Sequence, residues 1–476
     1  MNLNQTLQEK YPHLEVSVLK LSEVKKNIDF RIDDSFWTMK LIYNNKLNYK
    51  KIGECLLKSQ YGISINMNEG GDGIPIYRMN DIDNMLCNFE VKKYALIDKN
   101  ELQTFRLNYG DVLFNRTNSY EFVGRTGIFY NNRENFVFAS YLVRLVCNKE
   151  ILLPEYLTVF LNTHIGKKEI RRRARPSINQ TNVNPEELKE IKIPIFPMEF
   201  QLEIQNLVKD SHKALEESKE LYKKAEETLY LELGLDPKNP LQSLLDSKTN
   251  NPTKSLNISI HTLKESFLKT GRLDSEYYQS KYEDIEKFIK SYPNGYDSFS
   301  NIINNKDTNF TPKNNENYSY IELANIGNNG NISEPISDLG KNLPTRARRI
   351  VSKGDVIISS IEGSLSSCAL ITQEFDKHLV STGFFVLNSK LLNGETLLVM
   401  FKSQIFQEYL KKFPSGTILC AINKEELSKI LIPKIDPTTQ EKIAKYIQES
   451  FNLRKKSKQL LDNAKNKVEE QIQGKI

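Results

Sequence analysis

The chain has 476 residues, of which 39% are hydrophobic and 26% are charged, and its formal net charge is +6. This length excludes a single ordinary core and favours about three domains. The composition is that of a globular protein, and the small basic excess is compatible with a nucleic-acid partner without requiring one.

The cysteines and the apolar runs exclude further classes of protein. The five cysteines are far apart and form no C-x-x-C pair, which argues against a zinc site and against a disulfide framework. No run of about 18 apolar residues occurs, and the N-terminal sequence lacks the order of a signal peptide. We therefore expect a cytoplasmic protein with no membrane partner.

A short motif occurs near the start of each half of the chain. The sequence is FRIDDSFW from Phe30 and GRLDSEYY from Gly271, so Arg, an aliphatic residue and Asp precede an aromatic pair both times. Short alternating strands broken by Gly, Asn and Asp follow in both halves, a pattern typical of an irregular mixed sheet. Among them, LNYGDVLFNRT (107–117) parallels VSKGDVIISSI (351–361). We interpret the Gly-Asp as a structural turn and expect function in the loop after the strand.

Basic residues follow the next helix of each half. The helix from Pro154 leads into RRRARPSINQTNVN, and the helix from Gly394 leads into Lys411, Lys412 and then Phe-Pro-Ser-Gly-Thr. Both halves therefore place cations and a Pro-Ser pair at the same point of the repeat.

The longest repeat runs from Asn184 to Leu233 and returns from Asn423 to Ile472. Each copy has Asn-x-Glu-Glu-Leu, a short apolar strand that ends in Ile-Pro, a Gln seven residues later and a long charged helix. The spacing is constant, since 433 − 194 = 239 and 440 − 201 = 239. Two homologous halves explain this match.

The two long helices are expected to span about 36 residues, or roughly 54 Å at about 1.5 Å per residue. Pro197 and Pro437 suit the first turn of each helix. Apolar residues recur at spacings of three and four along both helices, and a helix this long has no core of its own. We therefore predict that the two apolar seams pack together as an antiparallel coiled coil.

The predicted fold class is α+β, with two homologous mixed α/β domains separated by the two long helices. The domains are expected at residues 1–196 and 258–436, the helices at 197–236 and 437–476, and a linker rich in Gly, Pro and polar residues at 237–257. The Asn-rich stretch 294–331 is interpreted as loop or edge structure.

Several catalytic motifs are absent from the sequence. It contains no P-loop, no dinucleotide-binding G-x-G-x-x-G after a strand and no Asn-Pro-Pro-aromatic tetrapeptide, and its five histidines lack metal-binding spacing. A nuclease triad built from acidic residues and a Lys remains an alternative. No catalytic or metal-binding residue is predicted, and the pattern favours a binding module.

The repeated element follows the pattern L..I.IP..P...Q..I. The first copy matches it with Leu188, Ile191, Ile193, Pro194, Pro197, Gln201 and Ile204, and the second with Leu427, Ile430, Ile432, Pro433, Pro437, Gln440 and Ile443. With the two Gly-Asp-Val strands, this pattern resembles the DNA specificity subunits of type I restriction-modification systems, and the resemblance covers nearly the whole chain.

The resemblance implies a non-catalytic subunit in which one target-recognition domain reads each half of a split double-stranded DNA target. The paired helices would hold the domains apart and dock two modification (methyltransferase) subunits, which bring S-adenosylmethionine. Restriction or motor subunits would bring ATP and magnesium, and this chain would bind no cofactor itself. The alternatives are the recognition part of a self-contained restriction endonuclease or methyltransferase, and a coiled-coil adaptor that binds only protein.

Candidate DNA contacts are polar or cationic residues near the expected loops. In the first half they are Arg171, Arg172, Arg173, Arg175, Arg116, Asn118, Ser119, Gln60, Tyr61, Ser64, Arg78 and Asn80. In the second half they are Lys313, Arg346, Arg348, Arg349, Ser360, Glu362, Ser364, Lys411, Lys412 and Thr417. The arginine run is expected to contact phosphates, and the alternative is a solvated helix end. The loops are expected to reach base edges, and the alternative is a set of surface turns.

The second loop lacks the Arg of the first, so the two halves should read different sequences. Residues predicted to serve subunit docking or the spacer are Gln201, Ile204, Leu207, Gln440, Ile443 and Ile447.

Overall fold

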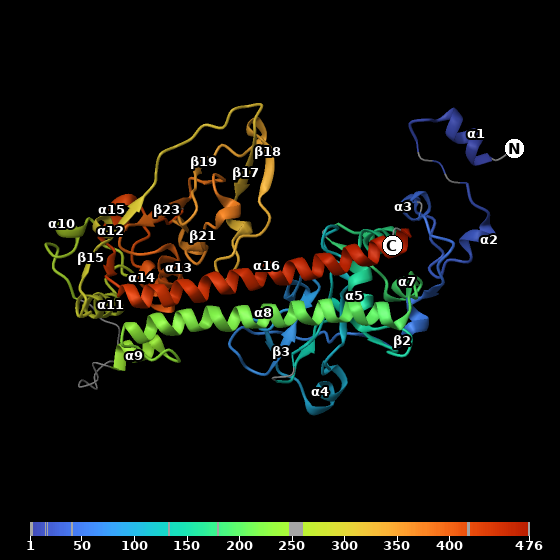
Figure 1. Cartoon of the computed structure of the whole chain (residues 1–476), viewed down its shortest axis with the longest axis horizontal. Coiled ribbons are helices and arrows are strands. Elements are labelled where there is room, and N and C mark those ends of the chain that lie inside the picture. Colours follow the sequence, from blue (N-terminus) through green and yellow to red (C-terminus); the bar gives the residue numbers. More distant parts are fainter. Residues whose placement is uncertain are drawn as a thin grey trace. The chain divides into compact units, whose positions relative to one another are not determined.

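The computed structural model describes residues 3–14, 16, 18–39, 41–131, 134–178, 180–246, 260–416 and 419–474 (Figure 1). The chain divides into two compact units. The first comprises Met1–Leu215 with Lys455–Ile476, and the second comprises Glu216–Arg454. Two long helices, α8 (Met198–Glu232) and α16 (Pro437–Gln473), each contribute one part to the first unit and the other part to the second.

The first unit is built on a six-stranded sheet with three small sheets beside it. The strands of the large sheet, in spatial order, are β2 (Leu56–Tyr61), β11 (Leu142–Cys147), β7 (Val112–Asn115), β9 (Thr126–Ile128), β5 (Leu86–Cys87) and β4 (Ile82–Asp83). The small sheets are β10 (Val137–Phe138), β3 (Ile74–Tyr77) and β6 (Tyr94–Ala95); β12 (Arg175–Pro176), β13 (Thr181–Asn182) and β8 (Thr117–Asn118); and β1 (Tyr49–Lys51) with β14 (Lys192–Pro194). The helices are α1 (Leu3–Lys10), α2 (Leu21–Val24), α3 (Asp34–Thr38), α4 (Lys99–Phe105), α5 (Pro154–Asn162), α6 (His164–Arg173), α7 (Pro185–Lys189), η1 (Ile52–Cys55) and η2 (Met79–Asp81).

The second unit contains two four-stranded sheets and one strand pair. In spatial order the sheets are β16 (Ile303–Asn305), β23 (Phe384–Ser389), β20 (Val356–Ser359) and β21 (Cys368–Leu370); and β18 (Ile336–Leu339), β17 (Asn317–Ile321), β22 (Leu379–Ser381) and β19 (Ala347–Ile350); the pair is β15 (Tyr296–Ser298) with β24 (Leu431–Pro433). The helices are α9 (Pro240–Asp246), α10 (Phe267–Thr270), α11 (Ser280–Lys290), α12 (Phe299–Ile302), α13 (Gly394–Lys402), α14 (Gln404–Leu410), α15 (Lys424–Lys429), η3 (Leu323–Asn325), η4 (Gly340–Asn342), η5 (Glu362–Ser364) and η6 (Gln373–Phe375).

The sequence repeat is a repeat of topology. In the first unit β11 lies between β2 and β7, and in the second unit β23 lies between β16 and β20, with antiparallel pairing throughout. The Gly-Asp turn precedes β7 and β20 alike. Its glycines, Gly110 and Gly354, have φ of 89° and 87°, a conformation that other residues adopt only with strain. The carboxylates of Asp111 and Asp355 each accept a hydrogen bond from a backbone N–H three residues earlier, at 2.9 and 2.8 Å, so the turn is structural as predicted.

The Arg-x-Asp motif performs the same task in both units. Arg31 donates two hydrogen bonds to Asp33, and Arg272 donates two to Asp274, all between 2.6 and 2.8 Å. Arg31 also donates to the carbonyl of Arg173 at 2.8 Å, and Arg272 donates to the carbonyl of Phe413 at 3.2 Å. Each arginine therefore ties the start of its half to the end of α6 or to the segment just after α14.

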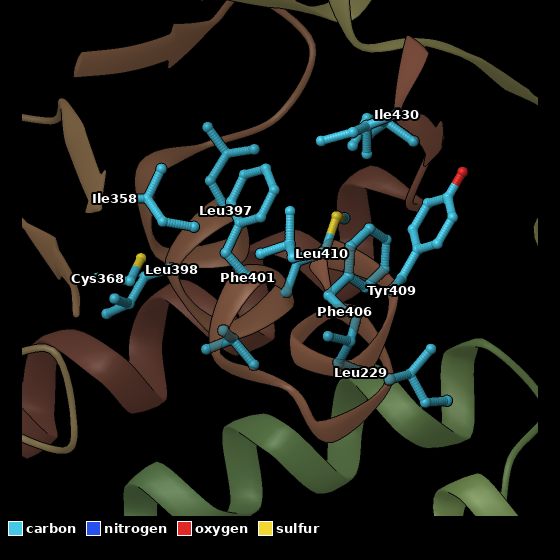
Figure 2. Packing of buried hydrophobic residues seen from close by; sticks show 14 of the residues in the cluster. Leu229, Ile358, Cys368, Leu397, Leu398, Phe401, Phe406, Tyr409, Leu410 and Ile430 are labelled. Atoms are coloured by element: carbon cyan, nitrogen blue, oxygen red, sulfur yellow. The ribbon is translucent and has the colours of Figure 1, made fainter. Parts of the chain in front are cut away.

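The long helices form part of the core of each unit. Figure 2 shows Phe401, Phe406 and Tyr409 of α13 and α14 packed with Ile358 of β20 and Leu229 of α8. In the first unit the core includes residues from both long helices, namely Ile204, Val208, Leu461, Ala464 and Val468. The apolar seams are therefore packing surfaces, as the periodicity predicted.

Serine pairs join α8 to α16 inside each unit. In the first unit the hydroxyls of Ser211 and Ser457 lie 2.8 Å apart, and in the second unit those of Ser218 and Ser450 lie 3.0 Å apart. All four serines are buried. Residue numbers rise along one helix as they fall along the other, so the paired segments run antiparallel.

Several local expectations need correction. The stretch predicted as a linker, 237–257, includes α9, and Leu244 of this helix lies in the core of the second unit; residues 247–259 lie outside the described residues. The Asn-rich stretch 294–331, interpreted as loop or edge structure, contains the edge strand β16 and the paired strand β15, but also α12 and the inner strand β17. Pro197 precedes α8, and its carbonyl accepts from the N–H of Gln201 at 3.2 Å, whereas Pro437 is the first residue of α16. Within the described part of the chain, every helix is too short or too polar to cross a membrane.

Candidate nucleic-acid interface

The loop after β7 lies beside the hairpin that follows α6. β8 pairs with β13 so that Thr117 faces Asn182, and β12 pairs with β13 so that Arg175 faces Asn182. The Thr117 hydroxyl also donates to the Asn182 side-chain oxygen at 2.6 Å. This small sheet brings together two segments that the sequence singled out separately, the loop at 116–119 and the basic run at 171–175.

Two arginine–tyrosine pairs lie on this loop. The guanidinium of Arg116 is 5.1 Å from the centre of the Tyr61 ring, and that of Arg171 is 5.8 Å from the centre of the Tyr120 ring. Arg171, Tyr61, Tyr120 and Ser119 are exposed, and Arg116 is half-buried. The structure thus collects cations, aromatic rings and polar side chains on one surface, a combination suited to nucleic acid. Tyr120 was not among the predicted residues, and its place next to Ser119 in the same loop was the available signal.

The arginine run does not act as one cluster. Arg173 is buried, forms an ion pair with Glu169 and lies 3.8 Å from Glu187, so its prediction as a phosphate contact is wrong. The reason is helical geometry: at about 100° per residue, Arg171 and Arg173 point to different sides of α6.

Two other arginines of the run contact the N-terminal segment. Arg172 is half-buried, with its guanidinium 4.3 Å from the centre of the Phe36 ring, and it donates to the Phe36 carbonyl at 2.7 Å. Arg175 is exposed and forms an ion pair with Asp29. Among the described residues, Arg171 and Arg172 form no ion pair, and of these two arginines only Arg171 is exposed.

The weaker first-half candidates have varied surroundings. The Gln60 side chain accepts from Arg144 and donates to the Thr104 carbonyl at 3.2 Å, so it is occupied within the unit. Arg78 lies 3.7 Å from the Asp81 carboxylate. Ser64 and Asn80 are exposed.

The loop after β20 in the second unit has the same setting. Ile361 forms an antiparallel bridge with Ala421, and Ser415 bridges Ala421 from the other side. The loop thus lies beside the segment that follows the Pro-Ser pair, as in the first unit. Ser360 donates to the Gly383 carbonyl at 2.9 Å, the Ser364 hydroxyl is 2.8 Å from that of Ser359, and Glu362 is exposed.

A cavity of about 240 Å³ lies beside this second loop and was not foreseen. Its lining includes Tyr320, Glu322, Arg346, Ile361 and Ser381. Arg346 lies 3.8 Å from Glu322, and the buried Tyr320 hydroxyl has no hydrogen-bond partner. Of these residues only Arg346 was a predicted contact. The signal for Glu322 was its position at the end of the strand in YSYIELANI.

The other second-half candidates are engaged with their own unit. Lys313 pairs with Glu316 at 2.8 Å, Lys411 pairs with Glu408 at 2.7 Å, and Arg348 donates to the Thr345 carbonyl at 2.8 Å. Two further cations are half-buried: Arg349 donates to the carbonyl of Phe384, and Lys412 lies 4.9 Å from the centre of the Tyr277 ring. Thr417 lies outside the described residues.

The helix residues proposed for docking lie inside the units. Gln201 accepts from the Leu153 N–H and donates to the carbonyls of Ile151 and Phe196, between 2.9 and 3.1 Å. Gln440 makes the equivalent three bonds in the second unit. Ile204, Ile443 and Ile447 are fully buried, and Leu207 packs against the core. Gln201, Ile204, Gln440, Ile443 and Ile447 are buried inside their own units and Leu207 is half-buried, so these side chains fit the spacer part of the prediction better than the docking part.

The acidic residues, histidines and cysteines were compared with the requirements of a metal site and of a reactive thiol. No group of three or more His, Cys, Asp or Glu is placed to hold a metal ion in the described parts of the chain. All five cysteines are described and unpaired. Burial raises the pKa of the Cys368 thiol to about 12, so this thiol stays protonated and is a poor nucleophile.

Comparison with known proteins indicates the class to which this repeated scaffold with two polar loops is similar. Residues 64–227 match the family model described as "Type I restriction modification DNA specificity domain". The relative named "Putative type I restriction enzyme MjaX specificity subunit", from Methanocaldococcus jannaschii, is 23% identical over 412 residues, which cover 86% of this chain and 88% of the relative. The EcoKI specificity subunit of Escherichia coli is 27% identical over 161 residues, 33% of this chain and 34% of that protein.

Residues 64–227 carry a type I restriction-modification DNA specificity domain, and over most of its length the chain is similar to a type I specificity subunit, the family that the sequence resemblance indicated. Members of this family recognise DNA sequences and are the non-catalytic subunits of their systems. Among solved structures, the type I S subunit from M. genitalium aligns with 90% of this chain and 96% of its own, at 14% identity and a TM-score of 0.42.

Proposed function

We propose that this subunit recognises a DNA target in two parts, one read by each unit. The proposal rests on one observation: both units place the loop after their Gly-Asp strand beside the hairpin that follows a short helix, yet the loops carry different side chains. The same scaffold would therefore present two different sets of contacts. In the first unit the set is Arg116, Asn118, Ser119, Tyr61 and Arg171.

The side chains of the first loop suit both phosphates and bases. Arg pairs with guanine and Asn with adenine in the major groove, and each good bidentate pair contributes roughly 1–3 kcal/mol of discrimination. Arg116, held over the Tyr61 ring, is the candidate for base contact. Arg171, exposed and without an ion pair among the described residues, is the candidate for phosphate contact.

The second loop would read a different sequence. Ser360, Glu362 and Ser364 replace the Arg and Asn of the first loop, and a carboxylate accepts from the cytosine amino group. Glu322 and Arg346, at the mouth of the adjacent cavity, extend this set.

The two long helices would act as the spacer between the recognition units, as an antiparallel two-helix coiled coil. The serine pairs at 211–457 and 218–450 support this role, because they join the same two helices inside each unit. Since the helices are paired, the spacer is lengthened only when both gain the same number of turns. Such an insertion after Glu217 and before Phe451 should change the spacing of the two target parts and leave both parts unchanged.

The chain would work within a larger complex. We propose that it docks two modification subunits, which carry S-adenosylmethionine, and restriction or motor subunits, which carry ATP and Mg²⁺. The docking surface would consist of exposed side chains, because the seam residues of both helices are buried in their own units.

The test is a selection of DNA from a random library with the chain reconstituted with its modification subunits. We expect enriched sequences with two fixed parts at a constant spacing. Arg116→Ala should relax one position of one part by roughly 10- to 100-fold. Arg171→Ala should weaken binding to all sequences and reduce the salt slope by about 1, whereas the exposed Lys287→Ala on α11 should change neither. A single continuous motif, or no motif, would refute the proposal.

A further inference from the structure

A large cavity lies in the first unit away from the candidate DNA loop. Its volume is about 940 Å³, and its lining includes the Gly110-Asp111 turn that precedes β7. The candidate DNA loop follows the other end of the same strand, which is about 13 Å long at about 3.3 Å per residue. No residue of the loop at 116–120 lines the cavity, so it is a separate site.

The lining is strongly cationic. It contains Lys58, Lys99, Arg106, Arg144 and Lys149 and one acidic residue, Asp111, so its formal charge is 5 − 1 = +4. Arg144 and Asp111 are paired with each other, 3.5 Å apart. The four remaining cations are exposed and have no ion pair among the described residues. Four like charges around one hollow repel each other, which an anionic ligand would relieve.

Hydrogen bonds from Arg144 hold part of the cavity lining in place. Arg144 is 4% exposed and donates to the carbonyl of Arg106 at 2.6 Å and to that of Thr104 at 3.2 Å. These bonds fix the segment that carries Arg106 and Tyr109. A site whose backbone is already fixed loses little entropy when a ligand binds.

The cavity lining also contains aromatic and amide side chains, which can recognise features of a ligand other than its charge. Tyr109 is 46% exposed and its ring centre lies 4.7 Å from that of Tyr130, which limits its movement. The amides of Gln103 and Asn108 also line the cavity. Aromatic rings stack on nucleobases, and amides bond their edges. The volume lies within the roughly 300–1,000 Å³ of small-ligand sites.

From this arrangement we propose that the cavity binds a chain of phosphate groups, as in a nucleoside triphosphate. Separate cations at several points of the lining match a ligand with several charged groups better than a single carboxylate. A free nucleotide and the backbone of a nucleic acid both present this chemistry. The size of the cavity and the exposed Tyr109 ring, on which a base could stack, favour the nucleotide.

The experiment measures binding of ATP and of inorganic tripolyphosphate to the full chain by titration calorimetry, at low and moderate salt. Lys58→Gln with Lys149→Gln removes two exposed cations and leaves the Arg144–Asp111 pair intact, so the fold should survive; the circular dichroism spectrum and melting temperature check this. We expect saturable binding that weakens at least 10-fold in the double variant. Lys149→Arg should retain it, and the exposed Lys92→Gln, which lies outside the cavity, should leave it unchanged.

A second arm separates the two sources of phosphate by measuring the salt slope for random-sequence duplex DNA with the same variants. Triphosphate binding that is lost in the double variant, with an unchanged slope, supports a nucleotide site. A slope reduced by about 2, without triphosphate binding, supports the same phosphate chemistry from the DNA backbone. If neither triphosphate binding nor a reduced salt slope is observed, the proposal is overturned. Arg116→Ala should leave triphosphate binding intact, so this site and the DNA loop can fail independently.

Discussion

Replacing Gln440 with alanine tests how α16 is anchored to the second unit. The Gln440 side chain accepts from the N–H of Asn393 at 2.9 Å and donates to the carbonyls of Leu391 and Ile435 at 3.1 and 2.9 Å. At a net value of about 1 kcal/mol for each hydrogen bond, Gln440→Ala should lower the local stability by about 3 kcal/mol.

Hydrogen exchange followed by mass spectrometry is the suitable assay, because a chain with two units does not unfold in one step. A loss of about 3 kcal/mol should speed exchange about 100-fold in peptides that cover residues 388–396 and the first turns of α16. Gln448→Ala is the matched control on the same helix. Its side chain is exposed and makes one bond, to Glu395 at 2.7 Å, so the change should stay below about fivefold.

The repeat supplies a second control. Gln201 makes the same three bonds in the first unit, so Gln201→Ala should speed exchange at residues 149–156 and the start of α8, and leave residues 388–396 unchanged. An effect of less than about threefold at Gln440, or equal effects of either variant on both units, would refute this account of the anchors.

Three further predictions concern a buried charge, backbone conformation and side-chain hydrogen bonds. Burial raises the pKa of Glu226 to about 7 from an ordinary 4.5, so stability falls as pH rises from 4.5 to 7. Glu226→Gln should therefore add about 1–3 kcal/mol at pH 8 and nothing at pH 4, whereas Glu227→Gln should add nothing at either pH. Hydrogen exchange at both pH values, in peptides that cover residues 222–230, measures this difference. Gly354→Ala should cost about 1 kcal/mol in the same assay, because φ is 87° and no atom lies within 4 Å of the added Cβ, so only backbone strain contributes. Arg272→Ala removes bonds to Asp274 and to the Phe413 carbonyl, and should speed hydrogen exchange at residues 267–275 at least 10-fold; an unchanged rate would show that the motif does not hold this segment.

The sequence predicted the features that depend on periodicity and spacing. The constant offset of 239 residues identified the repeat, and the spacing of apolar residues identified α8 and α16, whose 35 and 37 residues agree with the expected 36. The Gly-Asp turns were predicted because glycine is favoured at a positive φ, and Gly110 and Gly354 both have one.

Features that depend on the direction of a side chain were not predictable in the same way. The run at Arg171–Arg175 has a clear charge, but the sequence does not say that Glu169 and Glu187 lie where Arg173 points. The two buried glutamines are part of the family pattern, yet two of the three partners of each lie about 50 residues earlier in the chain. The cationic cavity is built from residues between Lys58 and Pro154 on several elements, so no single stretch of the sequence predicts it.

The central claim is that each unit reads its own part of the DNA target. The most direct measurement maps methylated sites in DNA treated with the chain and its modification subunits, for the unchanged chain and for a variant with Arg116→Ala, Asn118→Ala and Ser119→Ala. We predict that the variant alters one part of a two-part target and preserves the other part and the spacing. An unaltered target, or a change in both parts at once, would contradict the claim.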